Sequence, residues 1–136
     1  MRIDEITVGM TAEHAKTVTE ADVVLFAGIT GDFNPVHVDA EAAAKSRFGA
    51  RIAHGMLSAG FVSAVIAMKL PGPGSIYMSQ SLRFTRPVMI GDTVTARVEV
   101  VEVMEAKKRI RLTTVCRNQR GEMVLDGEAL MMVPDG

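Results

Sequence analysis

An acidic side chain and an imidazole lie five positions apart in this sequence, at Asp32 and His37. Pro35 lies between them; it lacks a backbone N–H, fixes its own φ and pushes Asn34 out of the α region. Gly31 permits a sharp turn just before the acid. We therefore predict a rigid, non-helical loop that holds one water molecule between the two groups. Such a pair can carry out general acid–base catalysis.

The same residues also fit an ordinary turn, because Gly-Asp and Asn-Pro pairs are common turn formers. Asn34 would support either structure by hydrogen-bonding to its own backbone, and Pro35 would stiffen it. Rigidity is expected where two side chains must point at one place. From the residues alone, a catalytic loop and a structural turn both remain open.

A second candidate feature is Gly55, which follows His54 at the start of an apolar run. The first backbone N–H groups of a helix have no partner within the helix and carry partial positive charge. Without a side chain, Gly55 leaves its N–H accessible to a carbonyl oxygen, as an oxyanion hole requires. The alternative is that Gly55 only begins the helix and that His54 is a structural histidine.

Ser63 is a polar residue within this apolar run, and it shares a helix face with Ala59 and Ile66. If that face borders a ligand, Ser63 and Ile66 line it. A hydrogen bond from Ser63 to the carbonyl four residues earlier is the simpler alternative.

Other chemistries find little support in the sequence. The three histidines, His14, His37 and His54, show no metal-ligand spacing such as H-E-x-x-H, so we predict no metal site. Cys116 is the only cysteine, which excludes an internal disulfide and a thiolate cluster within one chain. We expect it to be a buried apolar residue of a strand. No G-x-S-x-G string indicates a serine nucleophile.

Composition sets further limits on the function. The 136 residues fit a single domain over 1–136, and 48% hydrophobic residues make disorder improbable. A net charge of −1 without a Lys/Arg cluster argues against nucleic-acid binding. We expect no signal peptide, because residues 1–5 include acidic side chains and no apolar region follows them. The longest apolar stretch, residues 55–68, is shorter than the about 20 residues that span a bilayer. We therefore expect a cytoplasmic protein that does not cross a membrane.

The hydrophobic patterns predict mostly helices before Pro71 and mostly strands after it. We expect a strand over residues 11–17, a helix capped by Thr19, a short helix capped by Asp39, and a long buried helix over residues 55–70. Alternating residues then predict four strands, at 76–84, 93–104, 109–117 and 122–133, with a hairpin turn at 118–121. This segregation indicates an α+β fold. One long helix wrapped by an antiparallel sheet is the outline of a hot-dog fold.

Three blocks resemble the MaoC-like, hydratase-2 type of (R)-specific enoyl-CoA hydratase. They are residues 31–37 (GDFNPVH) followed by alanines, residues 54–57 (HGML), and residues 70–77 (LPGPGSIY) with 81–84 (SLRF). The third block is similar to short single-domain members that supply precursors for polyhydroxyalkanoate synthesis. The resemblance covers nearly the whole chain.

The resemblance implies a dimeric hot-dog protein that adds water to a trans-2-enoyl-CoA, with no cofactor besides the coenzyme A of its substrate. It assigns Asp32 and His37 as the catalytic pair and the Gly55 N–H as the group that polarises the thioester carbonyl. Ser63 falls near the active site in the family. Ile66, and Leu130 on the last strand, are the residues expected to limit acyl length.

Three other functions remain open at this stage. The same fold could act as a 3-hydroxyacyl thioester dehydratase, running the reaction in reverse, or as an acyl-CoA thioesterase. A non-enzymatic acyl-CoA binding module would make Asp32 and His37 incidental.

Overall fold

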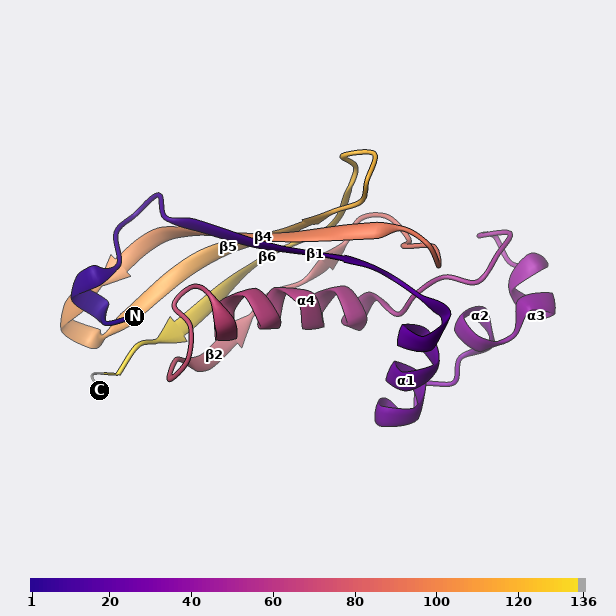
Figure 1. Ribbon diagram of the computed structural model, residues 1–136, viewed down its shortest axis with the longest axis horizontal. Helices are drawn as coiled ribbons and strands as arrows, with labels where there is room; N and C mark the ends of the chain where they lie inside the picture. Colours follow the sequence, from indigo (N-terminus) through magenta and orange to yellow (C-terminus); the bar gives the residue numbers. More distant parts are fainter. Residues whose placement is uncertain (135–136) are drawn as a thin grey trace.

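The computed structural model describes residues 1–134. A six-stranded antiparallel sheet lies over one long helix, and three short helices extend beyond the end of the sheet (Figure 1). The helices are α1 (Glu20–Thr30), α2 (Pro35–Val38), α3 (Ala40–Ala44) and α4 (Gly55–Met68). The strands are β1 (Thr11–Thr17), β2 (Ile76–Gln80), β3 (Arg83–Phe84), β4 (Thr93–Met104), β5 (Arg109–Arg117) and β6 (Met123–Met132). Two 3₁₀ turns, Ile3–Glu5 and Glu105–Lys107, complete the elements.

The strand order is β1-β4-β5-β6-β2, and β3 also pairs with β6. Alternate residues of the central strands point toward α4 and are fully buried, among them Val94, Val98, Ile110 and Leu112. Their neighbours along the strands form the opposite, more polar face of the sheet. The core therefore lies between one face of the sheet and α4, as the period-2 pattern predicted.

The predicted strand over residues 76–84 is interrupted. It forms β2 and β3, because the chain between them crosses over Gly127 of β6. A Cβ at Gly127 would overlap the carbonyl oxygen of Ser81. The Ser81 N–H donates to the Glu128 carbonyl at 2.9 Å, and the Glu128 N–H donates to the Ser81 hydroxyl at 3.0 Å. This crossing depends on a contact between distant segments, so local sequence patterns do not reveal it.

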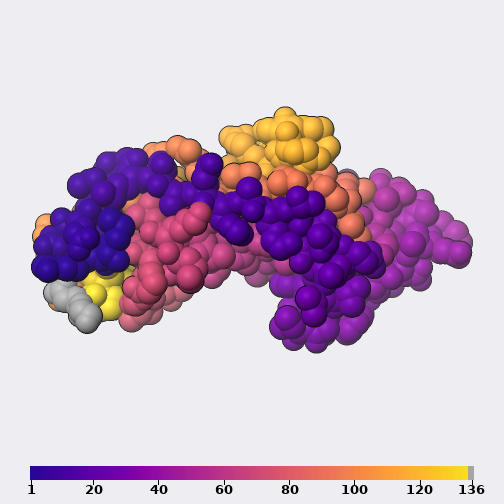
Figure 2. All heavy atoms as spheres, in the orientation of Figure 1, coloured from indigo at the N-terminus to yellow at the C-terminus, as the bar shows by residue number. Residues whose placement is uncertain are grey.

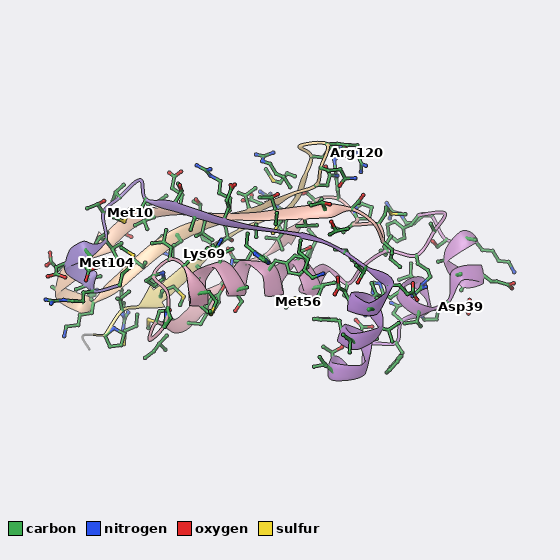
Figure 3. All side chains as sticks on the ribbon, in the orientation of Figure 1. Met10, Asp39, Met56, Lys69, Met104 and Arg120 are labelled. Atoms are coloured by element: carbon green, nitrogen blue, oxygen red, sulfur yellow. The ribbon has the colours of Figure 1, made fainter. Side chains whose placement is uncertain are left out.

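The long helix is less buried than we predicted. Phe61, Val62, Val65 and Ile66 face the sheet and are buried, but Met56 is 53% exposed. Figure 3 places Met56 and Lys69 near opposite ends of α4. A single sheet covers only one side of a helix, so the other side stays accessible in one chain. Figure 2 shows the α1–α3 part as a lobe projecting beyond the sheet.

No helix of the described residues is long and apolar enough to cross a membrane.

Candidate active site

The acid-bearing loop begins where α1 ends. Gly31 terminates α1 in the left-handed conformation, with φ of 84°, which glycine adopts without strain. The next residue, Asp32, is held locally at two points. Its N–H donates to the Thr30 hydroxyl at 3.1 Å, and its carboxylate accepts the Asn34 N–H at 3.2 Å. The predicted turn therefore forms, and it leaves the Asp32 side chain exposed.

Asn34 braces the loop as predicted, because its side-chain oxygen accepts the Val36 N–H at 3.3 Å. One part of the prediction was wrong: the backbone between Asp32 and His37 is not wholly non-helical. Pro35 occupies the first position of α2, where a missing N–H costs nothing and a fixed φ suits a helix. His37 consequently lies on a helical turn whose start is capped by Asn34.

Two hydrogen bonds fix His37 in place. Its Nδ1 lies 2.7 Å from the carbonyl oxygen of Ile52, and its own carbonyl accepts the Arg51 Nε–H at 2.6 Å. Arg51 also binds the Glu20 carboxylate at 2.7 Å, which links α2 to the first turn of α1. The ring is 8% exposed and is therefore shielded from bulk water.

Asp32 and His37 do come together in space. One ligand atom from each of Asp32, His37 and His54 lies within 4.8 Å of the others. A water molecule hydrogen-bonded at about 2.8 Å to two groups can bridge such a distance. The geometry thus supports the predicted proton-transfer pair, and it places the His54 ring beside that pair.

His54 is the site residue that the sequence interpretation underestimated. It lies parallel to His37, with ring centroids 3.9 Å apart, and its Nε2 lies 2.9 Å from the Asp32 carbonyl oxygen. Only 2% of its surface is exposed. Its position directly before Gly55 and its place in the block 54–57 were the signals that the sequence offered. Nothing local links His54 to a loop 22 residues earlier.

The same three side chains, Asp32, His37 and His54, form the one group among residues 1–134 that is close enough to hold a metal ion. Backbone carbonyls already bind one nitrogen of each imidazole. Each ring therefore has a single nitrogen left for a ligand. The two rings are stacked rather than spread around a common point.

Gly55 begins α4 and lines a pocket of about 440 Å³ together with His37, Ser58 and Phe84. The aromatic ring of Phe84 lies directly against Gly55: a Cβ there would be 2.7 Å from Cε1 of Phe84. The side chains of Arg47 and Arg86 also line this pocket. An apolar pocket with a helix N-terminus and basic groups suits an acyl thioester with an anionic carrier.

The three predicted substrate-binding residues lie outside this pocket. Ser63 is half-buried on α4, and Ile66 is fully buried in the core. Leu130 lies on β6, where it pairs with Arg111 of β5 and Ser79 of β2. Its buried neighbours Ala129 and Met131 face α4. None of the three lines the pocket at Gly55 and His37.

Comparison with known proteins identifies the family. The family model described as "MaoC like domain" matches residues 5–121. An (R)-specific enoyl-CoA hydratase of Rhodospirillum rubrum is 51% identical over 131 residues, which covers 96% of this chain and 90% of that protein. The chain belongs to the MaoC-like family.

Two further relatives extend this comparison within the MaoC-like family. A 3-hydroxybutyryl-CoA dehydratase of Methylorubrum extorquens is 49% identical over 131 residues, covering 96% of this chain and 83% of that protein. The solved unliganded structure of R-hydratase PhaJ1 from Pseudomonas aeruginosa has a TM-score of 0.94 at 50% identity. Its match covers 99% of this chain and 86% of that one. This likeness confirms the α+β hot-dog fold that the sequence predicted.

Proposed function

We propose that this MaoC-like protein is an (R)-specific enoyl-CoA hydratase that converts a trans-2-enoyl-CoA into an (R)-3-hydroxyacyl-CoA. The observation that carries the proposal is the approach of Asp32 to His37 within 4.8 Å, beside a pocket that contains Gly55. High identity to an (R)-specific hydratase over nearly the full chain supports the reaction and its stereochemistry.

In the proposed mechanism, Asp32 and His37 hold the attacking water. Its oxygen adds to C3 while one of the pair removes a proton, and the pair returns a proton to C2 on the same face of the double bond. The N–H of Gly55 donates to the thioester carbonyl and stabilises the negative charge of the enolate that develops there. The overall change is the addition of H and OH across C2=C3, which is redox-neutral and needs no redox cofactor.

Hydration is reversible, so the same groups would catalyse dehydration of a 3-hydroxyacyl-CoA. The dehydratase name of the Methylorubrum relative supports keeping this direction as part of the proposal. A supply of polyhydroxyalkanoate precursors, a role in fatty acid metabolism and a cytoplasmic location fit this activity. The lone, buried cysteine is consistent with a reducing compartment.

We further propose a homodimer. The side of α4 away from the sheet exposes Met56, and the edge strand β2 exposes Ile76 and Met78, which are 50% and 40% accessible. An edge strand with apolar side chains is a template for pairing with a second copy. Light scattering during size-exclusion chromatography should give twice the chain mass; a monomer at micromolar concentration would contradict this part of the proposal.

The activity is tested with crotonyl-CoA, with and without a metal chelator. We expect loss of the enoyl absorbance, formation of the (R)-3-hydroxy product on chiral analysis, and no effect of the chelator. Release of free thiol without loss of the double bond would identify a thioesterase instead. Tight binding without any product would identify an acyl-CoA binding module.

A further inference from the structure

The Asp32 loop has one hydrogen bond that reaches beyond its own neighbourhood. Thr30 and Asn34, which bind its backbone and side chain, are both two residues away from Asp32. Among the described residues, the bond between His54 Nε2 and the Asp32 carbonyl is the only one that ties residues 31–34 to a distant segment. The position of the acid relative to α4 therefore depends on His54.

The acceptor defines the proton arrangement of this ring. A carbonyl oxygen can only accept, so Nε2 of His54 carries the proton. Its Nδ1 is buried and has no hydrogen-bond partner among the described residues. A buried donor without an acceptor is unfavourable, so Nδ1 is the nitrogen without hydrogen. His54 is accordingly the Nε2–H tautomer.

Three components of the proposed site meet at His54. It binds the backbone of Asp32, stacks on His37, and directly precedes Gly55 in the chain. Phe26 of α1 closes one side of its ring, with centroids 4.8 Å apart. The ring therefore fixes the acid, the base and the helix N-terminus relative to one another.

We infer that His54 is a positioning residue of the hydratase, which holds the Asp32 carboxylate in reach of the same water as His37 by donating from Nε2 to the Asp32 carbonyl. This inference rests on the proposed function. His54 itself transfers no proton, because its Nε2 proton is engaged by the backbone. Displacement of a catalytic group by about 1 Å can cost about 100-fold in rate, so the loss of this single bond should be visible in turnover.

Two variants distinguish the contribution of the His54 hydrogen bond to turnover from the contribution of its aromatic ring. His54→Gln places an amide N–H at the same number of bonds from Cα as Nε2 and can still donate to the Asp32 carbonyl. His54→Phe keeps a flat ring against His37 and removes the donor. We expect kcat of the Phe variant to fall about 10- to 100-fold with KM within about 3-fold, and kcat of the Gln variant to stay within about 5-fold of the original.

His14 offers a matched control, because it is a half-buried histidine on β1 whose ring contacts Phe61 edge-on, 6.5 Å between centroids. His14→Gln and His14→Phe should leave kcat unchanged. Equal losses in both His54 variants, or normal kcat in His54→Phe, would overturn the inference. Thermal unfolding curves of all four variants show whether each one is folded under assay conditions.

A second measurement needs no enzymatic activity and is read from the wild-type protein. Long-range ¹H–¹⁵N correlation spectra of the histidine-labelled protein distinguish imidazole tautomers. The His54 ring, assigned by the signal lost in His54→Gln or in a His54→Asn spectrum, should show the proton on Nε2. A proton on Nδ1 instead would overturn the inference. An inactive wild-type protein with the Nε2–H form would contradict only the proposed function.

Discussion

Nδ1 of His37 lies 2.7 Å from the backbone carbonyl oxygen of Ile52. Because the carbonyl can only accept, Nδ1 carries the proton, and Nε2 is the nitrogen with a free lone pair. One nitrogen thus anchors the ring to the segment before α4, while the other remains able to take a proton from water. The two nitrogens of this ring therefore have different roles, and a substitution that keeps a donor at the position of Nδ1 but removes Nε2 tests them separately.

His37→Asn should do this. The asparagine amide can replace Nδ1 as the donor to Ile52, but it cannot accept a proton from water near neutral pH. We expect kcat for crotonyl-CoA to fall by about 10²- to 10⁴-fold with little change in the urea midpoint. Asp32→Asn serves as the companion variant. Wild-type turnover in both would exclude the pair as the catalytic groups.

Gly55→Ala tests the contact between α4 and β3. The new Cβ would lie 2.7 Å from Cε1 of Phe84, so the ring must move, whereas the backbone N–H is kept. We expect kcat/KM to fall about 10- to 100-fold. The same substitution made in a Phe84→Leu background should cost less, because the smaller side chain leaves room. An equal loss in both backgrounds would show that the ring contact is not the cause.

Arg51→Ala should loosen the catalytic segment. Its guanidinium joins the His37 carbonyl to the Glu20 carboxylate, and only 16% of the Arg51 side chain is exposed. We expect the free energy of unfolding to fall by about 1–3 kcal/mol, because the buried carbonyl loses a charged donor. Arg51→Lys should recover part of this, since an ammonium cannot reproduce the fork geometry. Chemical denaturation measures both, and unchanged stability in Arg51→Ala would contradict the structural role.

Substitutions of Ile66 test whether this core residue also limits the length of the acyl chain that the protein accepts. It is fully buried, so Ile66→Ala should lower stability by about 2–5 kcal/mol, and Ile66→Val by about 0.5–1.5 kcal/mol. The valine variant remains folded enough for kinetics over a series of enoyl-CoA lengths. A shift of preference toward longer chains would support the predicted role of Ile66. The same length profile as the wild type would assign it to the core alone.

Burial raises the pKa of the Cys116 thiol from 9.0 to about 12. The unfolded chain therefore loses this proton first as the pH rises, and the thiol favours the folded state below pH 9. Between pH 9 and 12 its contribution should decline by about 1.4 kcal/mol per pH unit. Urea titrations at several pH values give the free energy of unfolding of the wild type and of Cys116→Ala. The two proteins should differ in how steeply this free energy falls between pH 9 and 12, and the same pH dependence in both would mean that the thiol is accessible. Iodoacetamide should label the native protein only slowly at pH 8.

Local signals in the sequence were sufficient for most elements. Thr19 accepts the Asp22 N–H and Asp39 accepts two N–H groups of α3, as expected for helix caps. The alternation in β4 and β5 also placed the correct residues against the core. Pro35 misled the interpretation, because the same fixed φ that disrupts a helix interior favours a helix start.

Features that depend on distant contacts could not be predicted in this way. The break between β2 and β3 arises where Ser81 crosses Gly127, which lies 46 positions later in the chain. The inferred role of His54 also depends on a distant contact. Its partner is the backbone carbonyl of Asp32, and no sequence pattern predicts that hydrogen bond. Motif residues pointed to the proposed catalytic pair, whereas the contacts that hold these residues in place became visible only through the fold.

The part of the chain from α1 to α3, which carries Asp32 and His37, extends past the end of the sheet, whereas α4 lies against the sheet (Figure 1). Ile66 is fully buried on α4. Most of the buried apolar residues consequently lie apart from the proposed proton-transfer pair. Laboratory evolution toward higher thermal stability would accumulate changes in the core between α4 and strands β4 and β5. Selection for a different reaction would act on residues 31–37. The two kinds of improvement could then be combined in one molecule with little mutual interference.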